Sequence, residues 1–206
     1  MTRIARTLSL LIALAVIAGC SPTPSAPTES SFQTPQNTLQ LIGAIRQLTA
    51  SGRILDSGFY TEDNLKRAFG GSNVSVEVGK HDVIIGSYWA SVSNFPWMPS
   101  QNNMPLKLRR LTMHPDGELQ ASVNLLFQER PAGIDLAAIE QQFGKSWTET
   151  LQPVPSPHRG PGPSCWSTDK TIVYMFGDKR SGWTAKFNFD CDGILSSMFI
   201  DANRPK

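Results

Sequence analysis

The chain has 206 residues, of which 40% are hydrophobic and 17% charged. This composition argues against a disordered protein, because it supplies enough apolar side chains for a buried core. The formal net charge is +2, and without Arg3 and Arg6, which lie in a leader expected to be cleaved, 17 basic residues face 17 acidic residues. A balanced charge argues against a protein that binds nucleic acid electrostatically.

The first twenty residues combine two basic side chains with a short apolar run. Arg3 and Arg6 precede residues 8–18, a run that is too short to span a membrane, which takes about 20 residues. The run ends in Ile17-Ala18-Gly19-Cys20, which resembles the bacterial lipobox. This resemblance implies that residues 1–19 are a signal peptide and that Cys20 becomes the lipid-modified first residue.

The residues after Cys20 indicate where the protein is located. Cys20 is followed by Ser21 rather than Asp, and in this the chain resembles enterobacterial lipoproteins that are delivered to the outer membrane. Residues 20–36 are rich in Pro, Ser and Thr, so we expect an extended tether rather than a folded segment. We therefore expect a periplasm-facing outer-membrane lipoprotein, whose acyl chains contribute about 0.8 kcal/mol per buried methylene to membrane binding.

Two further cysteines remain once Cys20 carries lipid. Cys165 and Cys191 form an even pair, and the periplasm is oxidising. The sequence therefore predicts a Cys165–Cys191 disulfide. Closing this loop stabilises the fold by about 3 kcal/mol in the chain-entropy model.

Helical periodicity occurs in three segments. Residues 38–50 place Leu41, Ile45 and Leu48 on one stripe. Thr61 is a suitable N-cap for a second helix, which ends at Gly70. A third helix is predicted over 134–143.

Strand-like segments follow the second and third helices. Alternating apolar and polar residues, clearest in 183–189, have the period of two that is typical of a sheet with one buried face. Asp116-Gly117 and Asp192-Gly193 are typical of hairpin turns. Strands are predicted near 73–79, 82–92, 106–114, 118–127, 147–152, 165–176, 182–190 and 194–200.

The order of these elements indicates an internal duplication, with chance similarity as the alternative. Leu65, Phe69 and Gly70 match Ile139, Phe143 and Gly144 at an offset of about 75 residues, and Trp89 matches Trp166. Both copies continue into a strand, an Asp-Gly turn and a second strand. We expect an α+β fold of two tandem units, residues 37–130 and 131–206, each a short helical segment packed on a small antiparallel β-sheet.

Two such units resemble the β-lactamase-inhibitor-protein fold, and a single unit resembles the small outer-membrane-assembly lipoproteins of the SmpA/OmlA type. The resemblance covers residues 38–201 and rests on element order, repeat length and the Cys pair. Only the second copy carries a Cys pair, which departs from the inhibitor family. The resemblance implies a non-catalytic protein whose sheet face or loops grip another protein.

No pattern of catalytic residues is evident in the sequence. His81, His114 and His158 are far apart, and no HExxH, GxSxG or phosphate-binding glycine motif occurs. We therefore expect no enzyme activity, no cofactor and no bound metal. Residues 188–193 are similar to the first half of a calcium loop, but Phe199 stands where the bidentate Glu would be, which favours a polar turn over a calcium site.

The candidate partner-binding residues lie in a loop and in the strands. The loop 93–105 carries almost no charge, and its large apolar side chains are either interface anchors or a cover over the sheet edge. They are Phe95, Trp97, Met98 and Met104.

Aromatic and basic residues of the strands are further candidates. Trp89 and Trp166, with Tyr88, Tyr174 and Trp183, either line an aromatic sheet surface or belong to the core. Lys107, Arg109 and Arg110 form either a basic patch for an acidic partner or a solvated edge strand.

These observations predict a lipid-anchored envelope protein that binds a protein partner, as an inhibitor or an immunity-type protein. The alternative is an accessory lipoprotein of outer-membrane assembly or envelope integrity. The partner in either case is a periplasmic or outer-membrane protein, and the membrane is contacted through the lipid.

Overall fold

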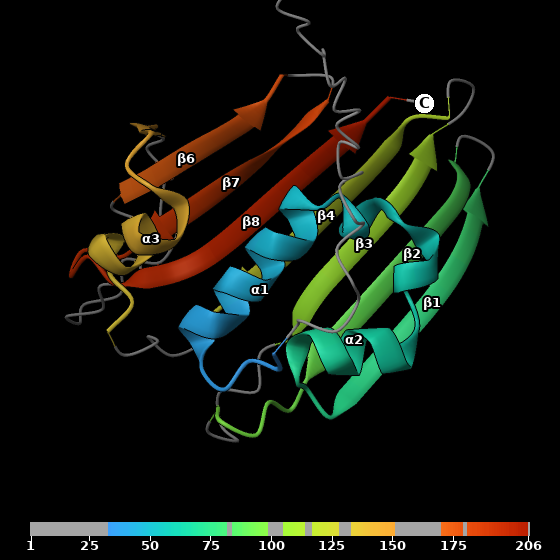
Figure 1. Ribbon diagram of the computed structural model, residues 1–206, viewed down its shortest axis with the longest axis horizontal. Helices are drawn as coiled ribbons and strands as arrows, with labels where there is room; N and C mark the ends of the chain where they lie inside the picture. Colours follow the sequence, from blue (N-terminus) through green and yellow to red (C-terminus); the bar gives the residue numbers. More distant parts are fainter. Residues whose placement is uncertain are drawn as a thin grey trace, which may run out of the picture. The chain divides into compact units, whose positions relative to one another are not determined.

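The structure of the chain is a computed structural model, shown in Figure 1. It describes residues 33–81, 84–98, 105–113, 117–127, 133–150, 170–178 and 181–205. The predicted signal peptide, Cys20 and most of the tether lie outside these residues, as do Met104, Cys165 and Trp166.

The first helix, α1 (Thr38–Ala50), forms where the apolar stripe predicts it. Asn37 caps the helix, because its side-chain oxygen accepts a hydrogen bond from the Gln40 N–H at 2.9 Å. The predicted stripe is fully buried: Leu41, Ile42, Ile45 and Leu48. Two short 3-10 turns, η2 (Arg53–Leu55) and η3 (Ser57–Phe59), follow the helix.

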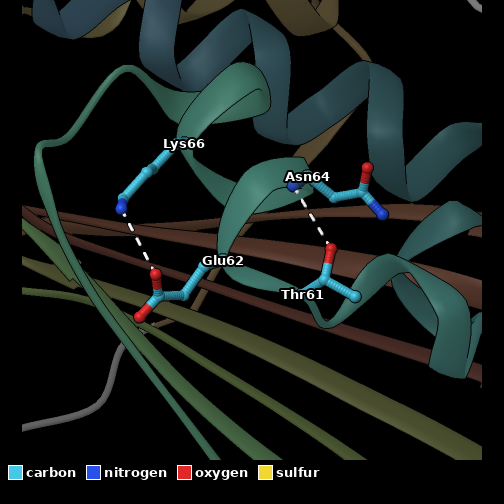
Figure 2. A network of polar contacts seen from close by, with 4 residues as sticks. All are labelled: Thr61, Glu62, Asn64 and Lys66. Carbon is cyan, nitrogen blue, oxygen red and sulfur yellow. Dashed lines mark hydrogen bonds and ion pairs between the residues drawn. The ribbon is translucent and has the colours of Figure 1, made fainter.

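The other two helices, α2 (Glu62–Phe69) and α3 (Leu136–Phe143), are built alike. The side chains of Thr61 and Asp135 accept hydrogen bonds from the N–H groups of Asn64 and Ala138, at 3.3 Å and 2.9 Å. Figure 2 shows the Thr61 cap.

A glycine with positive φ follows each of these two helices. Gly70 and Gly144 have φ angles of 77° and 83°, in a region that an L side chain rarely adopts. Figure 2 also shows the Glu62–Lys66 ion pair on the surface of α2, at 3.3 Å. Both partners are exposed, so the pair contributes less than about 0.5 kcal/mol.

All strands of the described residues belong to one antiparallel sheet (Figure 1). They are β1 (Asn73–His81), β2 (Ile84–Ser93), β3 (Leu106–Met113), β4 (Leu119–Leu126), β5 (Trp147–Glu149), β6 (Lys170–Gly177), β7 (Gly182–Phe189) and β8 (Leu195–Arg204). Their order across the sheet is β1-β2-β3-β4-β8-β7-β6-β5. The sheet therefore consists of two meanders, which meet where β4 pairs with β8.

The predicted combination of helices with antiparallel strands is confirmed, but the two tandem units with separate small sheets are not shown, because the strands form one continuous sheet. The described residues contain three α-helices and an eight-stranded sheet, and most of the structure is sheet. Strand lengths differ in places: β5 ends at Glu149 although a strand is predicted to residue 152, and β8 runs to Arg204 although the sequence predicts its end near residue 200. The reason for the longer β8 is its pairing with β4, which extends to Leu119↔Arg204 and is invisible to local sequence patterns.

The two faces of the sheet differ. Figure 1 shows α1, α2 and α3 on one side of it. Side chains that point to that side join one hydrophobic core, which includes Leu41 of α1, Phe69 of α2 and Phe143 of α3. Successive residues of a strand point to opposite faces, so every second strand residue points away from the helices. We call the first side the covered face and the second the open face.

A candidate binding surface on the open face

A hollow lies on the open face of β1 to β4. Its volume is about 550 Å³, and all of its lining residues come from these four strands. They are Ser75, Glu77, Trp89, Ala90, Ser91, Lys107, Leu108, Arg109, Ser122 and Asn124.

Strand register brings the polar side chains of the hollow together. Arg109 of β3 lies between Trp89 of β2 and Ser122 of β4. Two residues earlier, Lys107 lies between Ser91 and Asn124 in the same way. Along each strand, these polar residues alternate with residues that are buried in the core. The strand pairing that aligns the buried residues therefore also aligns the polar ones in rows on the open face.

Trp89 and Arg109 form a stacked pair in the hollow. The guanidinium carbon of Arg109 lies 4.6 Å from the centre of the Trp89 ring. A cation over an aromatic face is stabilised by about 0.5–1 kcal/mol at an exposed site. Trp89 nevertheless remains 46% exposed. The pair therefore presents a large aromatic surface next to a positive charge.

Two polar atoms on this surface lack a hydrogen bond. The Nε of Arg109 and the Oδ1 of Asn124 are shielded from solvent and have no partner among the described residues. A shielded polar atom without a hydrogen bond costs about 1–3 kcal/mol. Glu77, Lys107 and Arg109 also make no ion pair with any described residue. The hollow therefore contains hydrogen-bonding and charged groups that the described part of the chain does not satisfy.

The described part of the 93–105 loop packs against the core. Phe95 is only 2% exposed, and its ring lies 5.3 Å from that of Trp97. Trp97 and Met98 are half-buried against the same core. This placement corresponds to the alternative in which the loop covers the sheet edge. A partner-binding role for these residues, and for Met104 outside the described residues, stays a prediction.

The strand aromatics do not share one surface. Tyr88 belongs to the covered face, where its ring lies 5.5 Å from that of Tyr60. Tyr174 is fully buried, and Trp183 stacks on Phe176 at 4.0 Å against the core. Trp89 points the other way, so it is the aromatic residue of this group that the structure places in the hollow; Trp166 lies outside the described residues.

The predicted basic patch is divided between the two faces. Lys107 and Arg109 line the hollow, whereas Arg110 points to the covered face and is 9% exposed. The edge-strand alternative is wrong, because β3 lies inside the sheet between β2 and β4. The two open-face cations thus lie in the middle of this half of the sheet.

Sequence reasoning missed the polar partners Ser91, Ser122 and Asn124. The signal was present in the β3–β4 hairpin, since a turn at Gly117 sets the register that pairs Arg109 with Ser122. Without the pairing of β2 with β3 across a long loop, however, Ser91 could not be placed beside Lys107.

The turn between β7 and β8 is a polar turn, as predicted. The Oδ1 of Asp190 accepts hydrogen bonds from the N–H groups of Asp192 and Ile194, both at 3.0 Å. Cys191 is exposed in this turn, and Cys165 lies outside the described residues, so the disulfide stays a prediction. The described residues contain no group of three or more His, Cys, Asp or Glu side chains that could hold a metal ion.

Within the described part of the chain, no helix has the length and apolar character needed to cross a membrane. No protein-family model, curated protein or solved structure matches the chain.

Proposed function

We propose that this protein is a non-catalytic, lipid-anchored lipoprotein that faces the periplasm from the outer membrane and binds a protein partner with the open face of β1 to β4. One observation carries the binding role: the half-exposed Trp89, stacked with Arg109, in a hollow of about 550 Å³. The lipobox-like Ile17-Ala18-Gly19-Cys20 supports the anchor and its location.

The chemistry of the hollow supports binding to a protein. Trp and Arg are the residue types that most often dominate the binding energy of protein interfaces. Trp89 and Arg109 are of these two types, and Lys107 and Asn124 supply a polar surround.

The lining of the hollow gives little support to an enzyme. Its titratable side chains are Glu77, Lys107 and Arg109, with no His or Cys among the ten lining residues. The Glu77 side chain makes no hydrogen bond or ion pair with a described residue, so no described neighbour positions its carboxylate as a general base.

The order of the elements supports two tandem units. The succession α2, β1 to β4 has the same order as α3, β5 to β8, and the sheet order is mirrored about the β4–β8 pair. Each helix ends in Phe-Gly, and each Phe lies in the core. We propose that the units arose by duplication and, by the resemblance to the β-lactamase-inhibitor-protein fold, that the partner is an envelope enzyme that this protein inhibits.

Site-directed photo-crosslinking in the cells that make the protein tests this proposal. A photoreactive residue at Ser91, in the hollow, should capture a partner that mass spectrometry identifies as a protein. The same residue at Thr184, on the open face of β7, is the matched control and should not capture it. Trp89→Ala should abolish the Ser91 crosslink without changing the melting temperature by more than a few degrees, since Trp89 is half-exposed.

Equal capture from Ser91 and Thr184, or capture that survives Trp89→Ala, would contradict the proposed surface. Inhibition of a captured enzyme would support the inhibitor role, whereas capture of outer-membrane assembly machinery would indicate the accessory role. Mass spectrometry of the native protein that finds Cys20 without lipid would contradict the anchor.

A further inference from the structure

We propose that the hollow binds a carboxylate side chain of the partner protein, held between Lys107 and Arg109, so that the partner is recognised through an acidic segment. This inference rests on the proposed function and specifies the chemistry of the same surface. It follows from the charges, hydrogen-bonding atoms and shape of the hollow.

The hollow carries an excess of positive charge. Lys107 and Arg109 are two residues apart on the open face of β3, and Glu77 is the one acidic residue of the lining. Because a strand rises about 3.3 Å per residue, the two cations start about 7 Å apart. A carboxylate placed between them is within reach of both. Neither cation makes an ion pair with a described residue, so no described carboxylate neutralises either of them.

The geometry of Arg109 favours a planar carboxylate. Its guanidinium is held over Trp89 at 4.6 Å, which limits its movement before a ligand arrives. A guanidinium binds the two oxygens of a carboxylate in parallel hydrogen bonds, and such charge-assisted bonds are about twice as strong as neutral ones.

The neighbours of the two cations are neutral hydrogen-bonding groups. Ser91 and Asn124 lie on either side of Lys107, and Ser122 lies beside Arg109. Hydroxyl and amide groups can donate to carboxylate oxygens.

Glu77 limits the charge of the ligand. It lies opposite Trp89 in the β1–β2 pair, on the same face as the cations. Its negative charge repels a dianionic phosphate more strongly than a singly charged carboxylate. Glu77 also offers an ion-pair partner to a basic residue of the partner protein that lies next to the bound acidic residue. These features favour an acidic protein segment over a phosphate or an anionic lipid headgroup.

Binding of synthetic peptides to the full-length protein in detergent micelles tests the inference. The probe is a fluorescent peptide in which Glu alternates with Leu, and its control has Gln in place of Glu. Arg109→Gln and Lys107→Gln remove the two cations, and Lys186→Gln removes a cation from the open face of β7, outside the hollow. Melting temperatures confirm that each variant is folded.

We expect Arg109→Gln to weaken binding of the Glu peptide about tenfold or more, Lys107→Gln to weaken it less, and Lys186→Gln to change it less than about twofold. The Gln peptide should bind at least about tenfold more weakly than the Glu peptide. Inorganic phosphate, and phosphatidylglycerol added to the micelles, should not displace the Glu peptide at matched charge.

Three results would overturn the inference: no difference between the two peptides, an equal loss in Arg109→Gln and Lys186→Gln, or preferential binding of phosphate or phosphatidylglycerol. The Ser91 crosslink separates this failure from that of the proposed function. If the partner still crosslinks at Ser91 in the Arg109→Gln protein, the surface binds a partner without the carboxylate. If the wild-type protein gives no such crosslink, the proposed function itself fails.

Discussion

Two neighbouring arginines of β3 lie in opposite environments. Arg110 points to the covered face, where its Nε donates a hydrogen bond to the Leu55 carbonyl at 2.8 Å and its Nη1 donates to Thr112 Oγ1 at 3.0 Å. Arg109 points to the open face, where it stacks on Trp89 and its Nε has no partner among the described residues.

This difference indicates that Arg110 stabilises the fold, whereas Arg109 is placed to contact a partner. Arg110 contacts the 3-10 turn η2 and therefore ties the segment after α1 to the sheet. Arg109 contributes little to the fold, so its charge and its hydrogen-bonding groups remain available to a partner. The same alternation runs through the sheet, with Phe187 in the core and Lys186 on the open face of β7.

The largest expected effect on stability comes from the covered face. Phe187→Ala removes a fully buried ring that lies 4.9 Å from Phe143 and 5.9 Å from Tyr174. The cavity and the lost burial should lower the free energy of unfolding by about 3–5 kcal/mol. Urea denaturation measures this change. Lys186→Ala is the matched control on the same strand, and a loss of similar size there would break the comparison between the faces.

A smaller effect is expected from the arginines themselves. Arg110→Met keeps much of the side-chain volume but leaves the shielded Leu55 carbonyl without its donor, so stability should fall by about 1–3 kcal/mol. Arg109→Met should change the free energy of unfolding by less than about 1 kcal/mol, because it removes the favourable stacking on Trp89 and also the shielded Nε that has no hydrogen bond, and these two effects oppose each other. Equal losses in the two variants, measured by urea denaturation, would show that Arg109 is structural after all.

The smallest effect concerns an acidic residue of the open face. Asp201 of β8 lies opposite Ser122, and burial raises the pKa of its carboxyl above the ordinary value. The folded state disfavours the charged form of Asp201. The protein is therefore most stable with respect to this group below the ordinary carboxyl pKa, and its stability declines as the pH rises from there through the raised pKa of Asp201. Asp201→Asn should therefore stabilise the protein at neutral pH.

The gain should stay below about 0.5 kcal/mol, because the Asp201 carboxyl is only partly shielded and solvent screens much of its charge. Thermal unfolding at neutral pH and at a pH below the ordinary carboxyl pKa measures it. The difference between Asp201→Asn and wild type should shrink at the lower pH. A difference that is the same at both pH values would show that ionisation of Asp201 does not affect stability.

The local elements could be predicted from the sequence because their causes are local. The stripe of Leu41, Ile45 and Leu48 defines α1, and Thr61 and Gly70 define the ends of α2. The alternation in 183–189 likewise predicts β7. Capping, helical periodicity and hairpin turns each depend on residues within a few positions of one another.

The site could be predicted only in part. Trp89 and Arg109 were identified by their residue types, but Phe95 is also aromatic and lies in the core. Residue type indicates that a side chain can bind a partner, whereas its exposure depends on which elements pack against it. The alternation of a strand shows that Arg109 and Arg110 face opposite ways, yet it does not show which face the helices cover.

The amino-acid sequence by itself determined the helices, most of the strands and the antiparallel class, since these follow from short-range periodicity and turn chemistry. Only the tertiary structure decided that β4 pairs with β8, that the helices lie on one face, and that Trp89, Arg109 and Asn124 meet in a hollow on the other. These arrangements depend on contacts between residues far apart in the chain, whose free energy comes from burial of the shared core and leaves no local pattern.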